Sequence, residues 1–173
     1  MSKPTIADLV TAGVQPGDIL LVQHTSAISR LIRDVTHSLW SHATLIGQGY
    51  PDVWILLECV LDRGTSAVKI EEVLSDDSYT GLLILRGPTL GVADRETILR
   101  RAWLETAKRY DNAINLAILL GVPAEVGDRH FNCCSYVNDA YAVVGDVIDP
   151  TKPTPQAFAE SPSLVPVLQW LAA

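Results

Sequence analysis

Short apolar runs, separated by turns rich in glycine, proline and aspartate, fill the first half of the chain. Runs of this kind are typical of strands, and their hairpin-like spacing predicts a mostly antiparallel sheet. The predicted strands cover residues 18–23, 41–47, 53–61, 67–70 and 81–86. Alternation along 53–61 places Glu58 on the same side as Leu56 and Val60. Glu58 is therefore a carboxylate within an apolar run, which requires solvent or a partner.

Helical spacing of apolar residues dominates elsewhere. A stripe after the capping residues Thr25 and Ser26 consists of Ile28, Leu31, Ile32, Val35 and Leu39. Further helices are expected from Thr5 to Gly13, from Asp94 to about Arg109, over 113–120, from Cys134 to Gly145 and after Pro155. An apolar segment, 164–171, closes the chain. Strands and helices together predict a single α+β domain over residues 1–173.

Composition narrows the class of protein. The 173 residues are 48% apolar, which is enough for one well-buried core. The formal net charge is -7 and there is no basic run, so no nucleic-acid partner is expected. No apolar stretch reaches the roughly 18 residues of a membrane span; the longest, 113–122, contains Asn115 and Gly121. Without a recognisable secretory signal we expect a cytoplasmic protein, unless a dedicated secretion system exports it.

The three cysteines suggest thiol chemistry. Cys133 and Cys134 are adjacent, and because a disulfide between neighbours is strained, free thiols are expected. Both lie where an amphipathic helix is predicted to begin, and the positive end of a helix dipole favours a thiolate. We take Cys134 as the candidate nucleophile, although one residue of helix register decides between it and Cys133. Cys59 alternates onto the face opposite Glu58 and is expected in the core.

A cysteine nucleophile needs an imidazole as its base and a third group to orient that imidazole. His42 begins one predicted strand and Glu58 lies on the adjoining strand, so the two can pair and face Cys134. Tyr110, at the end of the long predicted helix, is a candidate donor to an oxyanion. A zinc site near His130 is disfavoured because no second pair of ligands is present, and no cofactor is expected.

Five segments, in this order, resemble the circularly permuted, YiiX-like branch of the NlpC-type papain-like amidases. They are Gly17-Asp18-Ile19, Ser41-His42-Ala43-Thr44-Leu45-Ile46-Gly47, Leu57-Glu58-Cys59, Arg109-Tyr110-Asp111 and Phe131-Asn132-Cys133-Cys134-Ser135-Tyr136-Val137. The resemblance covers roughly residues 16–145. It implies a permuted papain-like fold with a small barrel-like antiparallel sheet and packed helices.

The resemblance also implies roles for single residues. Cys134 would be the nucleophile, because Ser135 follows it as a serine follows the family cysteine, with His42 as general base and Glu58 as orienting group. Tyr110, Ser135 and Tyr136 are expected to contact the substrate; Tyr136 stands where the family has Glu.

The implied activity is hydrolysis of an amide bond in a small-molecule or peptide substrate, such as a cell-wall fragment. Two alternatives remain open at the level of sequence. One is an acyltransferase or thioesterase that acts on lipid-like acyl substrates. The other is a non-catalytic binding domain on the same fold. The oligomeric state is left open.

Overall fold

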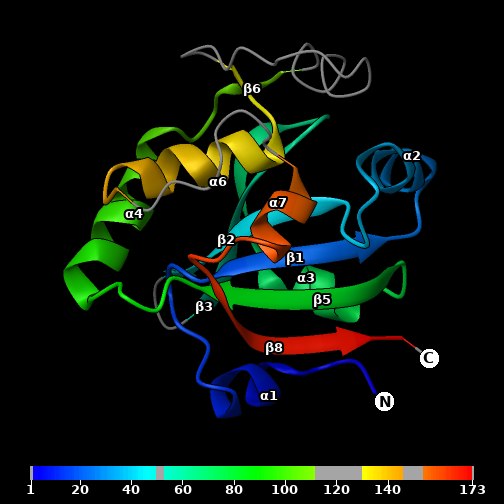
Figure 1. Ribbon diagram of the computed structural model, residues 1–173, viewed down its shortest axis with the longest axis horizontal. Helices are drawn as coiled ribbons and strands as arrows, with labels where there is room; N and C mark the ends of the chain where they lie inside the picture. Colours follow the sequence, from blue (N-terminus) through cyan, green and yellow to red (C-terminus); the bar gives the residue numbers. More distant parts are fainter. Residues whose placement is uncertain (1, 50–52, 112–129, 146–153, 173) are drawn as a thin grey trace.

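The computed structural model describes residues 2–49, 53–111, 130–145 and 154–172 (Figure 1). Six antiparallel strands form the main sheet in the order β4-β3-β2-β1-β5-β8. The strands are β1 (Ile19–His24), β2 (His42–Gly49), β3 (Val53–Val60), β4 (Gly64–Lys69), β5 (Tyr79–Arg86) and β8 (Val165–Leu171). The predicted antiparallel sheet and the hairpin of β2 with β3 are therefore confirmed.

The sheet is open in the part of the chain that the structure describes, with β4 and β8 at its edges. The small barrel-like closure that we expected is therefore not found in these residues. Pro166 lies in the edge strand β8, the kind of strand in which proline is tolerated.

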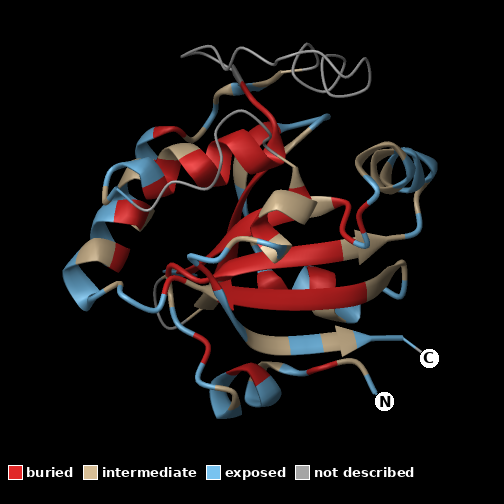
Figure 2. Cartoon of the chain, in the orientation of Figure 1, coloured by how far each residue is buried: buried red, intermediate tan, exposed pale blue. Residues whose placement is uncertain are grey.

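Helices cover both faces of the sheet (Figure 1). They are α1 (Ile6–Thr11), α2 (Ala27–Thr36), α3 (Ile70–Ser75), α4 (Val92–Leu104), α6 (Cys133–Ala142) and α7 (Pro155–Ala159). Alternate residues of β1 divide between two cores. Ile19 and Leu21 pack with residues of α4, α6 and α7, whereas Leu20 and Val22 pack with residues of α1 and α3. Figure 2 shows that the buried residues gather on the central strands of the sheet and on α6.

Helix boundaries differ from the sequence prediction at three places. α4 begins at Val92, because Asp94 caps it from the third position by accepting the N–H of Gly91 at 2.9 Å, and it ends at Leu104. α3 follows β4 directly and was not predicted. α6 begins at Cys133, one residue before the expected start. The helix predicted over 113–120 lies outside the described residues.

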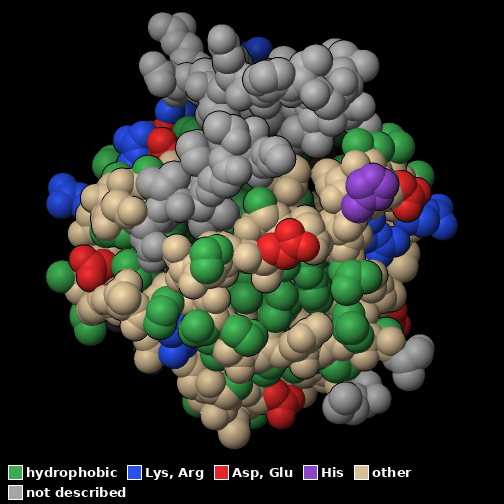
Figure 3. Space-filling model, in the orientation of Figure 1, with side chains coloured by type: hydrophobic (Ala, Val, Ile, Leu, Met, Phe, Trp, Pro, Cys, Tyr) green, Lys and Arg blue, Asp and Glu red, His purple; other side chains and the backbone are tan. Residues whose placement is uncertain are grey.

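α2 is amphipathic but buries none of its residues (Figure 2). Ile28 is 57% exposed and Leu31 is 51% exposed, so the predicted stripe does not enter the core. Hydrophobic side chains consequently lie at the surface over α2, in the upper right of Figure 3.

One buried carboxylate connects three elements. Asp18, at 0% exposure, accepts hydrogen bonds from Arg86 at 2.6 and 2.8 Å and from Arg95 at 3.1 Å. These contacts join the start of β1, the end of β5 and the first turns of α4. The neighbouring Gly17 has a φ of +91° and a side chain there would crowd Arg95, which explains why glycine precedes the aspartate. No helix among the described residues is long and apolar enough to span a bilayer.

Candidate active site

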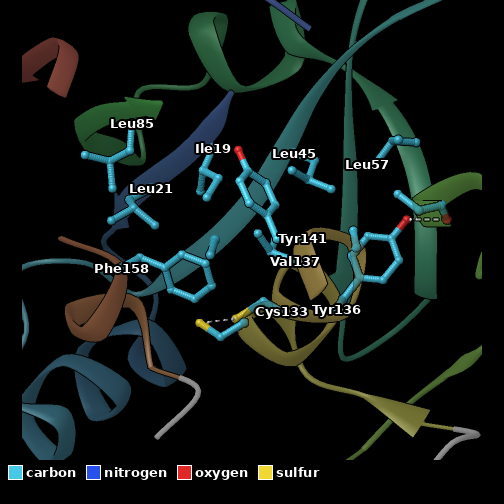
Figure 4. Packing of buried hydrophobic residues seen from close by; sticks show 14 of the residues in the cluster. Ile19, Leu21, Leu45, Leu57, Leu85, Cys133, Tyr136, Val137, Tyr141 and Phe158 are labelled. Carbon is cyan, nitrogen blue, oxygen red and sulfur yellow. Dashed lines mark hydrogen bonds between the residues drawn. The ribbon is translucent and has the colours of Figure 1, made fainter. Parts of the chain in front are cut away.

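α6 is fixed at both of its tyrosines. The Tyr136 hydroxyl donates to the carbonyl of Ala102 on α4 at 2.8 Å, and the Tyr141 hydroxyl donates to the carbonyl of Gly17 at 2.5 Å. Both tyrosines are almost fully buried, at 1% and 0% exposure. Because these bonds tie α6 to α4 and to the start of β1, the first turn of α6 has a defined position (Figure 4).

Asn132 sets the residue at which α6 begins. Its side-chain oxygen accepts the N–H of Ser135 at 2.7 Å, and the Ser135 hydroxyl accepts the N–H of Asn132 at 2.9 Å. This reciprocal capping box makes Cys133 the first helical residue and Cys134 the second. The positive end of the helix dipole therefore acts on both thiols.

His42 and Glu58 meet just beyond the last paired residues of β2 and β3, Leu45 and Leu57. The His42 Nε2 atom lies 3.1 Å from Glu58 Oε2, so the predicted contact is present. Glu58 is 5% exposed, and its other oxygen accepts from the Arg63 guanidinium at 3.2 Å. Its position in an apolar run is thus explained by two cationic or donor partners rather than by solvent.

Cys133 is the thiol that reaches His42. A side-chain hydrogen bond joins the two groups, and the backbone N–H of Ala43, next to His42, also donates to the Cys133 sulfur. The hydrogen bond with Cys134 lowers the Cys133 pKa most; burial raises it, and the charge and hydrogen bond of His42 lower it further. The resulting Cys133 pKa lies well below its usual range.

The pKa of the His42 imidazole is shifted in the opposite direction, upward. Burial lowers the pKa of His42, but the negative charge of Cys133 and the hydrogen bonds with Cys133 and Glu58 outweigh it and raise that pKa to about 10. A lowered thiol pKa beside a raised imidazole pKa favours a thiolate–imidazolium pair at neutral pH.

Cys134 is placed differently from the sequence prediction. It is 0% exposed and packs in the core, whereas Cys133 is 7% exposed. Burial and the charge and hydrogen bond of Cys133 raise the Cys134 pKa well above its usual range, and His42 does not contribute to that shift. The structure therefore brings His42 together with Cys133, because α6 begins one residue earlier than we assumed.

Ser135, Tyr136 and Tyr110, which were expected to contact the substrate, have contacts within the protein. Ser135 is 3% exposed and serves the cap of α6, and Tyr136 is committed to the core and to Ala102. Tyr110 lies on the short strand β6 (Arg109–Tyr110), paired with Phe131 of β7 (His130–Phe131). It is partly buried against the core that includes α6. Of the three, only Tyr110 is not fully buried.

Three groups at the site were not predicted from the sequence: Arg63, Asn132 and the N–H group of Ala43. Asn132 carried a usable signal, because asparagine is a preferred N-cap and would have placed the start of the helix at Cys133. Arg63 lies in the turn between β3 and β4, and nothing in the local pattern marks it as a partner of Glu58. The Ala43 contact is made by the backbone and depends on the approach of α6 to β2.

The fold is similar to a known structure. It resembles the crystal structure described as the metalloprotein YiiX from Escherichia coli O157:H7, with a TM-score of 0.69, 17% sequence identity, and coverage of 91% of this chain and 98% of that chain. The chain thus has a YiiX-like fold. No protein-family model and no curated protein matches the sequence.

The neighbour's description raises the question of a metal. Within residues 2–49, 53–111, 130–145 and 154–172, no three or more His, Cys, Asp or Glu side chains gather so that they could hold a metal ion. The described residues therefore do not fit a metal centre.

Proposed function

We propose that the chain is a cysteine-dependent hydrolase of amide bonds, in the manner of a permuted papain-like amidase, with Cys133 as its nucleophile. The observation that carries this proposal is the chain of contacts from Cys133 through His42 to Glu58. It supplies a thiolate, an imidazolium and an orienting carboxylate in the arrangement that covalent acyl transfer requires. The YiiX-like fold is compatible with this proposal and does not identify a substrate.

Acylation would begin with attack of the Cys133 thiolate on the substrate carbonyl carbon. A C–S bond forms, and the carbonyl oxygen gains a negative charge that the Cys133 N–H, in the first turn of α6, is available to stabilise. His42 then donates its proton to the leaving nitrogen and the C–N bond breaks. An amine departs and a thioester remains on Cys133.

Deacylation would use the same groups in reverse. Neutral His42 accepts a proton from water while the water oxygen attacks the thioester carbon. The C–S bond breaks, the acid is released, and the thiolate–imidazolium pair is restored. Glu58 holds the His42 ring through its Nε2 atom in both halves of the cycle.

Alkylation with iodoacetamide at pH 6 tests the nucleophile. A thiol with the usual pKa of about 8.5 is well under 1% ionised at this pH, so rapid labelling of Cys133, mapped by mass spectrometry, is expected only for the activated thiolate. His42→Ala should slow labelling at least about 10-fold. His24→Ala is the matched control, because His24 is also partly buried but bonds to Ser26 and Ser78. Labelling of Cys134 instead would restore the assignment made from sequence.

Reaction with an activated ester then distinguishes hydrolysis, acyl transfer and a non-catalytic binding domain. Incubation with p-nitrophenyl acetate should release one equivalent of nitrophenolate rapidly and leave acetylated Cys133. Slow decay of that acetyl group in water supports hydrolysis, and faster decay with an added primary amine supports acyl transfer. A thiol that labels at the ordinary rate and forms no acyl-enzyme would favour a non-catalytic binding domain.

A further inference from the structure

The thiol of Cys134 is in contact with the thiol of Cys133, the proposed nucleophile. The Cys133 and Cys134 sulfur atoms are 3.8 Å apart, and Figure 4 marks this contact with a dashed line. Cys134 is 0% exposed, so no solvent reaches its sulfur. Any interaction between the two thiols is therefore direct and is not mediated by water.

The surroundings of the two sulfurs decide which of them carries the proton. The imidazole of His42 and the N–H of Ala43 are both directed at Cys133 and both stabilise negative charge there. At Cys134, burial, the hydrogen bond with Cys133 and the negative charge of Cys133 all act against ionisation. These surroundings favour the proton on Cys134, with its S–H group as the donor in the contact.

The geometry argues against a disulfide between Cys133 and Cys134. Adjacent Cα atoms across a trans peptide are about 3.8 Å apart, below the usual Cα separation of about 4.4–6.8 Å in disulfides. Both residues also have helical geometry at the start of α6, and both thiols are free. A purely packing role is the other alternative, and it makes a different experimental prediction.

We infer that Cys134 is a positioning residue for the proposed reaction: its buried S–H donates a hydrogen bond to the Cys133 sulfur and keeps that sulfur ionised beside His42. The inference rests on the proposed function, because it gives Cys134 a role only if Cys133 is the nucleophile. A neutral thiol is a weak donor, but a charged acceptor roughly doubles the strength of a hydrogen bond. In this dry position no water can replace the donor.

The pH dependence of Cys133 alkylation tests the inference in the full chain. Cys134→Ala removes the donor and should move the midpoint of the pH–rate curve upward by about one to two pH units, as expected for one hydrogen bond to a charged group. Cys134→Ser keeps a donor of similar size and should keep the midpoint near that of the wild type. Cys134→Val provides a second donor-free variant that fills the space, in case the alanine variant does not fold.

Cys59→Ala is the packing control. Cys59 is also 0% exposed and lies in the same core, but its thiol donates to the Phe131 carbonyl at 3.1 Å. Its removal costs similar packing and should leave the Cys133 midpoint unchanged.

The outcomes separate this inference from the function on which it rests. A low wild-type midpoint that Cys134→Ala and Cys134→Val leave in place overturns the donor role of Cys134 and leaves the nucleophile standing. An equal rise in the alanine, valine and serine variants shows a packing role and also overturns the donor role. A wild-type midpoint at the ordinary thiol value removes the proposed nucleophile, and the role of Cys134 with it.

Discussion

Glu58 is a buried carboxylate with two different partners. Its two oxygens are shared between the His42 imidazole and the Arg63 guanidinium. The His42 contact is shielded, since the side chains are 19% and 7% exposed, whereas the Arg63 side chain is 50% exposed. Solvent weakens an exposed ion pair, so the two partners should not matter equally.

Glu58→Gln should therefore lower the rate of Cys133 acylation by p-nitrophenyl acetate at least about 10-fold, because the neutral amide no longer holds and stabilises the His42 imidazolium. Arg63→Ala should change that rate less than about threefold, because only an exposed pair is lost. Stopped-flow measurement of the nitrophenolate burst at pH 7 gives both values. Equal losses in the two variants would mean that Arg63, too, is needed to hold the carboxylate.

His42 offers a direct test of the charge state. Its pKa is raised from 6.5 to about 10 in spite of burial, chiefly by the charge of Cys133. A proton NMR titration should place the His42 midpoint near pH 10 in the wild type. In Cys133→Ala the raising charge is lost while burial still lowers the pKa, so the midpoint should fall to lower pH. An unchanged midpoint would show that Cys133 is uncharged beside the imidazole.

Among elements, α6 and α2 show what a sequence pattern can and cannot predict. The spacing of apolar residues correctly predicts both helices, because it reflects a local property of the chain. It does not predict the exact first residue of α6, which depends on the Asn132 cap and decides which thiol meets His42. Nor does it show that α2 buries none of its residues, since burial depends on what packs nearby.

The exposure of α2 leads to a prediction about stability. Leu31→Ser on α2 should change the free energy of unfolding by less than about 0.5 kcal/mol, as for most surface substitutions. Leu45→Ala on β2 should cost about 2–5 kcal/mol, because Leu45 is 0% exposed in the core beneath α6. Urea denaturation of both variants measures the contrast. A cost for Leu31→Ser close to that for Leu45→Ala would mean that something covers α2 in solution.

At the scale of the whole molecule, the candidate site depends on contacts between distant parts of the chain. Sequence patterns predicted the strand that carries His42 and the neighbouring strand that carries Glu58, because hairpin pairing follows from local spacing. They could not predict Arg63 or the hydrogen bond from Tyr141 to Gly17, which joins residues 124 positions apart. Such contacts form only when the sheet and α6 are already packed together.

Asp18 tests this dependence on long-range contacts. It is the buried partner of both Arg86 and Arg95, so Asp18→Asn would leave two guanidinium groups without their countercharge. Removal of one partner from a buried ionic group typically costs about 3–5 kcal/mol, and we expect a loss of that size in urea denaturation. Asp94→Asn is the matched control. It should cost about 1 kcal/mol or less, because Asp94 only caps α4 at the surface.

Since Asp18 and Tyr141 both anchor the start of β1, the Asp18 variant should also slow Cys133 alkylation at pH 6 under conditions where it remains folded. Full alkylation rates in a destabilised but folded Asp18→Asn protein would show that the first turn of α6 holds its position without this anchor.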